Sequence, residues 1–161
     1  MKDALINRRE FLRNLGVIGA GALLSMSPWL SVFSEVVETS SEKCHLAIIG
    51  TGSKGHFLMS FSLQNPKVEI VALCDIYQPS MEKALNLVRE AKVYTDYRKV
   101  LENKTVDAVL VATPLNLHCQ IVLDAFDAGK HVFCEKSIGF TMEECFRIYK
   151  KHISTGKVFF T

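Results

Sequence analysis

The sequence predicts an α/β fold built on a doubly wound parallel sheet with helices on both faces. After residue 43, short apolar runs alternate strictly with stretches of helical spacing. Most of these runs are apolar on both faces, as strands buried between two helical layers are. Strict alternation of strand and helix implies crossover connections and therefore parallel strands. The 161 residues have room for one ordinary domain and not for two.

The expected elements follow one another without an internal repeat or a low-complexity segment. Six strands are expected at residues 44–49, 68–74, 92–94, 106–112, 131–134 and 158–160. Five helices are expected at residues 53–64, 79–90, 97–102, 116–128 and 141–154. Pro79 suits a first helical turn, and Thr141 with Glu144 three residues later predicts a capping box. Gly129 and Gly156 suit helix ends.

The first 34 residues have the layout of an export signal. They contain four basic and two acidic side chains, which account for the whole net charge of +2, and their last 21 residues are uncharged. A basic region followed by an apolar region and small residues is typical of a secretory signal. An uncleaved membrane anchor is the alternative, although serines, glycines and a proline make the run a poor permanent span.

The basic region resembles a twin-arginine signal, because Arg8 and Arg9 are followed after one residue by Phe11 and Leu12. We therefore expect a signal peptide at residues 1–34, a linker at 35–43 and a cofactor domain at 44–161. A protein of this kind would be exported to the periplasm by the twin-arginine machinery. The residues after 34 carry no net charge, so no nucleic-acid partner is expected.

The five cysteines are odd in number and contain no C-x-x-C pair. This set does not predict a disulfide framework or a metal site, and we expect small core side chains instead. They are Cys44, Cys74, Cys119, Cys134 and Cys145.

The first expected strand leads directly into a glycine-rich loop that opens the first helix, which is the context that a G-x-G-x-x-G motif requires. Its first glycine permits a tight turn, its second lets the backbone approach a pyrophosphate, and its third lets the helix pack on the sheet. The helix N-terminus offers free N–H groups to the negative charge. We predict that the whole loop binds the cofactor: Gly50, Thr51, Gly52, Ser53, Lys54 and Gly55.

Asp75 ends the second expected strand, twenty residues after Gly55, where the dinucleotide fingerprint requires an acid. A carboxylate there accepts hydrogen bonds from ribose hydroxyls and repels a 2′-phosphate. Asp75 followed by apolar Ile76 therefore predicts NAD in preference to NADP. The alternative is an acid that merely ends a strand.

Two further motifs lie at the carboxyl ends of strands, where ligands bind in open parallel sheets. One is a Thr-Pro-x-x-x-His run that ends in His118, and the other is an Ala-Gly-Lys-His-Val-x-Cys-Glu-Lys run that ends in Lys136. Together with the glycine loop and Asp75, they make the sequence resemble the glucose-fructose oxidoreductase, inositol dehydrogenase and rhizopine-catabolism (Gfo/Idh/MocA) family of NAD(P)-dependent oxidoreductases. The resemblance covers about residues 44–161 and implies a Rossmann cofactor domain.

The resemblance also implies roles for five residues. Thr113, Pro114 and His118 would line the nicotinamide side of the cleft. Glu135 would contact the nicotinamide ribose region, and Lys136 would face substrate. A sugar carbon that loses hydride also loses a proton from its oxygen, which a buried lysine can stabilise or relay. Without the resemblance, Lys136 would be a solvated lysine and His118 a histidine satisfied by the backbone.

The chain departs from the family pattern at two positions. Leu115 stands where Asn is usual, and Ser137 stands where Pro normally completes Glu-Lys-Pro. The second change loosens the loop that holds Lys136.

Family members continue into a second α/β domain that forms the substrate pocket, so this chain is expected to be a fragment, inactive alone. The leading expectation is the NAD-binding half of an exported dehydrogenase that acts on a small sugar or polyol and forms a homo-oligomer at full length. The alternatives are an NAD-dependent glycoside hydrolase of the same family and a non-catalytic nucleotide-binding module.

Overall fold

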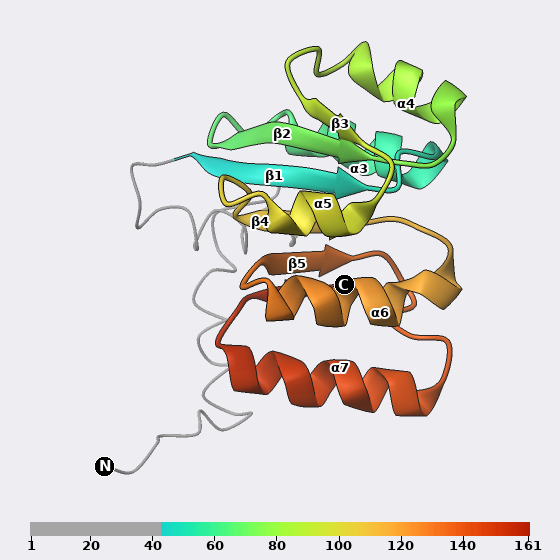
Figure 1. Ribbon diagram of the computed structural model, residues 1–161, viewed down its shortest axis with the longest axis vertical. Coiled ribbons are helices and arrows are strands. Elements are labelled where there is room, and N and C mark those ends of the chain that lie inside the picture. Colours follow the sequence, from blue (N-terminus) through green and yellow to red (C-terminus); the bar gives the residue numbers. More distant parts are fainter. Residues whose placement is uncertain (1–42) are drawn as a thin grey trace, which may run out of the picture. The chain divides into compact units, whose positions relative to one another are not determined.

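The computed structural model describes residues 43–161, which form a six-stranded sheet with helices on both faces (Figure 1). The predicted signal peptide and all but the last residue of the linker lie outside the described residues. The strands are β1 (Cys44–Ile49), β2 (Val68–Cys74), β3 (Lys92–Tyr94), β4 (Ala108–Val111), β5 (His131–Cys134) and β6 (Phe159–Phe160). The helices are α3 (Ser53–Ser62), α4 (Gln78–Leu85), α5 (Tyr97–Glu102), α6 (Leu115–Asp127) and α7 (Met142–Thr155).

The strand order is β3-β2-β1-β4-β5-β6, and every neighbouring pair is parallel. Among the described residues, β1 lies at the centre of the sheet, β2 and β3 follow outward on one side, and the chain then crosses back to β4 and continues outward to β5 and β6. The predicted doubly wound sheet is therefore confirmed. Its switch point lies between β1 and β4, where ligands bind in sheets of this kind.

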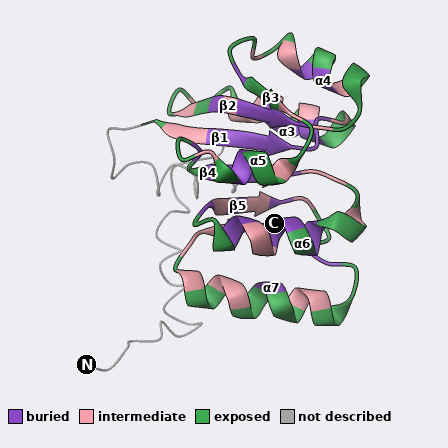
Figure 2. Cartoon of the chain, viewed as in Figure 1, coloured by how far each residue is buried: buried purple, intermediate pink, exposed green. Residues whose placement is uncertain are grey.

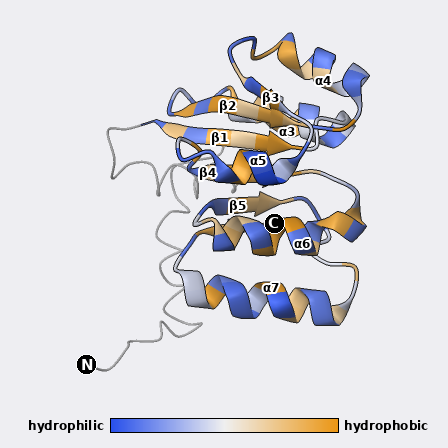
Figure 3. Cartoon of the chain, viewed as in Figure 1, coloured by the Kyte–Doolittle hydropathy of each residue, from blue (hydrophilic) through white to orange (hydrophobic). Residues whose placement is uncertain are grey.

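Two layers of helices cover the sheet. Helices α3 and α4 pack on one face, and α5, α6 and α7 contribute to the core on the other. Successive side chains of β1 point to opposite faces of the sheet and so contribute to both cores. Leu46 and Ile48 face the α3–α4 layer, whereas Ala47 and Ile49 face the α5–α7 layer. Figure 2 shows the buried centre of the sheet, and Figure 3 shows hydrophobic residues concentrated in the strands.

The pairing of β1 with β2 is irregular at one position. Leu46 pairs with Ile70 and Ala47 pairs with Ala72, so Val71 is an extra residue in β2. Val71 and Ala72 both pack toward the α5–α7 layer. This is the geometry of a β-bulge.

Most predicted helix boundaries are confirmed to within one residue. Glu144 N–H donates to Thr141 Oγ1, and the Thr141 N–H donates to the Glu144 carboxylate, which completes the capping box. Gly129 and Gly156 both follow helices with positive φ, at 72° and 64°. The expected helix at 79–90 is wrong at its end, because α4 stops at Leu85 and the chain continues in tight turns.

Buried polar groups join the amino-terminal ends of the strands. Lys130 is 6% exposed, and its Nζ donates to the carbonyl oxygens of Asn103 and Val106 at 2.9 and 2.7 Å. Burial lowers the pKa of Lys130. His131 Nδ1 accepts the Val158 N–H at 3.0 Å, and burial together with nearby Lys157 lowers the pKa of His131.

All five cysteines are free, as expected. Cys74, Cys119 and Cys134 are buried, whereas Cys44 and Cys145 are only half-buried. Burial raises the pKa of Cys74 and of Cys134 to about 12. None of the described helices is both long enough and apolar enough to cross a membrane.

Candidate functional site

A cleft of about 590 Å³ opens at the carboxyl ends of the central strands. Its walls come from the glycine loop after β1, from residues 74–77 after β2 and from residues 112–114 after β4. Residues 95–98, which follow β3, close one end. The cleft therefore lies at the switch point of the sheet, where the sequence predicts the cofactor.

Asp75 is held in this cleft by the glycine loop. The Thr51 N–H and the Thr51 hydroxyl both donate to Asp75 Oδ2, at 2.7 and 3.0 Å. The Tyr77 N–H donates to Asp75 Oδ1 at 2.9 Å. A carboxylate has about four acceptor sites, so Asp75 keeps one, on Oδ1. That site is suited to a ribose hydroxyl.

Each of the three glycines of the loop is required, or tolerated, for a different structural reason. At Gly50, where φ is +94°, a Cβ would lie 2.6 Å from the Ala112 carbonyl oxygen. At Gly55, a Cβ would lie 1.8 Å from the Gly50 carbonyl oxygen. At Gly52, a Cβ would meet nothing within 4 Å. Gly50 and Gly55 are therefore needed by the loop itself, whereas Gly52 leaves open space in front of the first turn of α3.

Two further features match the groups of a dinucleotide. No side chain caps the N-terminus of α3, so its first-turn N–H groups are available to a phosphate. Thr113 Oγ1 is buried and has no hydrogen-bond partner among the described residues. The open space at Gly52, the remaining acceptor of Asp75 and the Thr113 hydroxyl all fit a bound NAD.

His118 lies beneath the cleft and does not line it, in contrast to the expectation. It is 2% exposed, and its Nδ1 and Nε2 lie 2.8 Å from the carbonyl oxygens of Ser137 and Thr113. Which nitrogen donates depends on the tautomer. The ring thus joins the loop after β4 to the loop after β5.

The other predicted residues are placed around the rim. Ile76, 89% exposed, and Pro114, also exposed, both line the cleft. Ser53 and Lys54 are exposed in the first turn of α3. Glu135 is half-buried and Lys136 is exposed at the carboxyl end of β5, outside the residues that line the cleft. Lys136 thus lies at the surface of the described residues, and its expected role facing substrate stays a prediction.

The cleft also includes Tyr97 and Arg98, which sequence reasoning missed. The Tyr97 hydroxyl donates to Asp124 Oδ2 at 2.6 Å, and burial with this hydrogen bond raises the pKa of Tyr97 to about 12. The Arg98 guanidinium carbon lies 4.6 Å from the centre of the Tyr97 ring. The sequence feature that could have pointed to these two residues is Asp96, which follows the short strand β3 and caps α5.

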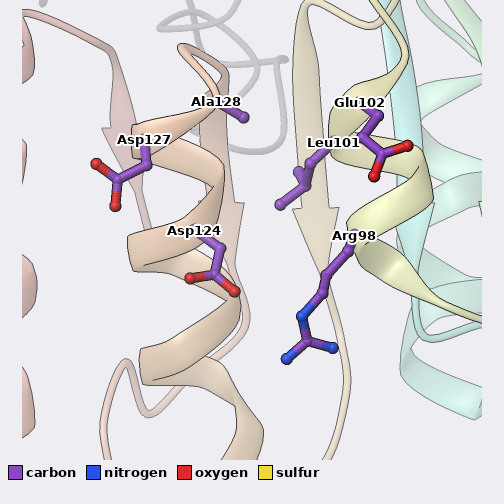
Figure 4. Close-up of a pocket in the computed structure, with 6 residues that line it drawn as sticks. All are labelled: Arg98, Leu101, Glu102, Asp124, Asp127 and Ala128. Carbon is purple, nitrogen blue, oxygen red and sulfur yellow. The ribbon is translucent and has the colours of Figure 1, made fainter.

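Arg98 also borders a second, smaller cavity of about 380 Å³ between α5 and α6 (Figure 4). Its acidic lining residues are Glu102, Asp124 and Asp127. No group of three or more histidine, cysteine or acidic side chains within residues 43–161 could hold a metal ion.

Comparison with known proteins shows which family this chain belongs to. The Gfo/Idh/MocA family model, described as an oxidoreductase family with an NAD-binding Rossmann fold, matches residues 44–161. A glycosyl hydrolase family 109 protein from Stenotrophomonas maltophilia is 32% identical over 94% of this chain and 34% of its own length. An α-N-acetylgalactosaminidase from Shewanella oneidensis is 28% identical over 89% of this chain and 36% of its own.

Solved structures agree with this assignment. An NAD-binding protein from Listeria innocua is 33% identical, with a TM-score of 0.66 over 73% of this chain and 33% of its own. A myo-inositol 2-dehydrogenase from Lactobacillus plantarum is 27% identical, with a TM-score of 0.69 over 74% of this chain and 36% of its own. The chain thus spans about a third of the length of the relatives that it matches. Since the family model covers residues 44–161, the chain belongs to the Gfo/Idh/MocA oxidoreductase family through its NAD-binding Rossmann domain.

Proposed function

We propose that this chain is the NAD-binding part of an enzyme that oxidises a carbohydrate carbon by hydride transfer. One observation carries the proposal: Thr51 fixes the Asp75 carboxylate beside the open space at Gly52. A ribose hydroxyl and a pyrophosphate need these two features at adjacent positions. Bound NAD would supply the acceptor for the hydride that leaves the sugar carbon.

Residues of this chain would hold the cofactor and handle the proton. The first-turn N–H groups of α3 would bind the pyrophosphate, and Asp75 Oδ1 would accept a ribose hydroxyl. Glu135 would lie near the nicotinamide ribose. Lys136 Nζ would relay the proton that the sugar hydroxyl loses as its carbon is oxidised. Lys136 is exposed here, so this role requires substrate and further protein to cover it.

The proposal is tested by titration calorimetry with NAD and NADP on the wild-type chain and on Asp75→Ser. We expect the wild-type chain to prefer NAD by at least about tenfold, and the variant to lose most of that preference. Asp107→Ser is the matched control, because Asp107 lies at the opposite end of the strands and bonds His45. An unchanged preference in the Asp75 variant would contradict the proposed cofactor site.

A glycoside hydrolase that uses NAD for transient oxidation is the second candidate. It is favoured by the names of the relatives from Stenotrophomonas maltophilia and Shewanella oneidensis, whereas the Lactobacillus plantarum structure favours a dehydrogenase. Both chemistries share the hydride step. Turnover of a chromogenic glycoside against that of free sugars and polyols, measured on the full-length protein, separates them.

We also propose that the protein leaves the cytoplasm by the twin-arginine route. The support is the Arg8–Arg9 pair with Phe11 and Leu12, followed by an uncharged apolar region. Export of a reporter fused to residues 1–43 is expected to stop when Arg8 and Arg9 are both replaced by lysine. Normal export of that variant would contradict the proposal.

A further inference from the structure

Helix α7 has an exposed apolar face in addition to its buried one. Its only buried residue is Ile148, which packs in the core with α6. Four large apolar side chains of α7 are nevertheless 57–71% exposed, and we call them the α7 stripe: Met142, Phe146, Tyr149 and Ile153. Figure 2 shows how much of α7 is exposed in comparison with the sheet.

The spacing of the α7 stripe is that of a helix–helix seam. The four residues follow one another at intervals of four, three and four, which places them on one side of the helix. This 3–4 alternation is the a/d pattern by which two helices pack side by side. A stripe of this kind on an exposed face is unusual for a surface that only contacts water.

We propose that the α7 stripe binds the α7 stripe of a second copy of this chain, with the two helices antiparallel about a two-fold axis. In this arrangement Phe146 faces Tyr149 of the second copy near the axis. Met142 faces Ile153 of the second copy at each end. The surface is self-complementary, as an interface across a two-fold axis must be. The proposal does not depend on the proposed cofactor or substrate.

Charge complementarity selects the second copy and the antiparallel direction. Glu143 and Lys150 lie seven residues apart on the same border of the stripe, and both are exposed. An antiparallel pair brings Glu143 of each helix next to Lys150 of the other, which gives two opposite-charge contacts. In a parallel pair, Glu143 of one helix lies level with Glu143 of the other, and Lys150 lies level with Lys150. The two opposite-charge contacts are then lost.

The helix is held firmly enough to present the stripe. The capping box fixes its N-terminus, and Gly156 in the left-handed conformation ends it. His152, on the border opposite Glu143, packs against Phe126 of α6 and Phe159 of β6, with ring centres 5.9 and 5.7 Å away. A rigid surface loses little conformational freedom when it binds.

The surface area that two α7 stripes can bury against each other limits how tightly they bind. A fully covered aromatic side chain buries 150–250 Å², and the stripe residues are each more than half exposed. Two facing stripes would remove on the order of 1,000 Å² from water, the lower limit for a specific interface. We therefore expect a weak dimer whose population depends on protein concentration.

Sedimentation equilibrium of the 161-residue chain, from micromolar to millimolar concentration, tests the inference. We expect a monomer–dimer equilibrium, and an increase of at least about tenfold in its dissociation constant for Phe146→Glu. Phe57→Glu is the matched control, because Phe57 is a phenylalanine of similar exposure on α3. A chain that stays monomeric throughout, because another segment or a different partner covers the stripe, overturns the proposal. So does an equal effect of the two variants.

Charge reversal tests whether the two α7 helices are antiparallel, without changing the apolar residues of the stripe. Glu143→Lys alone and Lys150→Glu alone are each expected to weaken the dimer, and the double reversal is expected to restore it. Thermal unfolding of each variant checks that the fold is kept. Glu143→Lys also removes an acidic side chain from the first turn of α7, which should lower the unfolding temperature by a few degrees. A double variant that is no better than the single variants overturns the antiparallel arrangement.

Discussion

Thr51 and Asp75 make a two-point contact, in which one Asp75 oxygen accepts both the backbone N–H and the hydroxyl of Thr51, at 2.7 and 3.0 Å. The contact connects the loop after β1 to the acid after β2. The position of the carboxylate is therefore set by the same loop that would hold the pyrophosphate. Loop and acid form one structural unit, although 24 residues separate them in sequence.

Thr51→Val should weaken NAD binding by about three- to tenfold, because it removes the hydroxyl hydrogen bond and lets the carboxylate turn. Thr51→Ser keeps the hydroxyl and should bind NAD nearly as well as the wild-type chain. Titration calorimetry measures both. If serine binds as weakly as valine, the hydroxyl is not what holds Asp75.

Gly52→Val and Gly55→Ala should separate binding from folding. Space at Gly52 is open, so the valine variant should unfold within a few degrees of the wild-type temperature and yet lose NAD binding. At Gly55 a single methyl group collides with the Gly50 backbone, so the alanine variant should be strongly destabilised. Calorimetry and thermal denaturation together check both outcomes. Tight NAD binding by the Gly52 variant would place the pyrophosphate elsewhere.

His118→Ala should destabilise the chain by about 2–4 kcal/mol, because a buried ring and its contacts with two carbonyl oxygens are lost. Amide exchange at residues 137–139 should accelerate, since the ring no longer holds that loop. His56→Ala, at a half-buried position on α3, is the control and should have a small effect. Unchanged exchange at residues 137–139 would show that His118 does not position the loop.

Stability should fall as the pH drops below the ordinary histidine pKa of 6.5, in part because of His131. Burial lowers the pKa of His131 in the folded chain, so below 6.5 the unfolded chain binds more protons. Protonation also removes the acceptor for the Val158 N–H. His131→Asn offers an acceptor that does not titrate, so its thermal midpoint should vary less over this range. Parallel pH profiles for the two proteins would exclude His131 as a contributor.

Local sequence signals predicted the parts of the fold that depend on neighbouring residues. The capping box at Thr141, the glycines after α6 and α7 and the alternation of strand and helix are all confirmed. The end of α4 could not be predicted this way. Met81, Ala84 and Val88 have helical spacing, yet Val88 reaches the core from a turn after the helix has ended. Periodicity cannot distinguish these two ways of burying a side chain.

The site was predictable where a motif carries it and unpredictable where tertiary contacts create it. The glycine loop and Asp75 follow a fixed spacing and lie together in the structure. The position of His118 depends on Ser137, nineteen residues away, whose carbonyl oxygen lies 2.8 Å from Nδ1 of the ring. The contribution of Tyr97 depends on α6, because Asp124 accepts its hydroxyl. No local pattern encodes such distant partners.

The extra residue in β2 sets which side of the sheet the residues after it face, and Asp75 of the cofactor site is one of them. Ile70 and Leu73 face the α3–α4 layer, and Ala72 and Cys74 face the other, only because Val71 occupies an additional step. If β2 kept Val71 but paired without the bulge, Ile70 and Ala72 would share a face, and every later residue would change sides, turning Asp75 away from Thr51. Deletion of Val71 would instead keep the faces, because Ala72 would follow Ile70 directly and still point to the opposite layer.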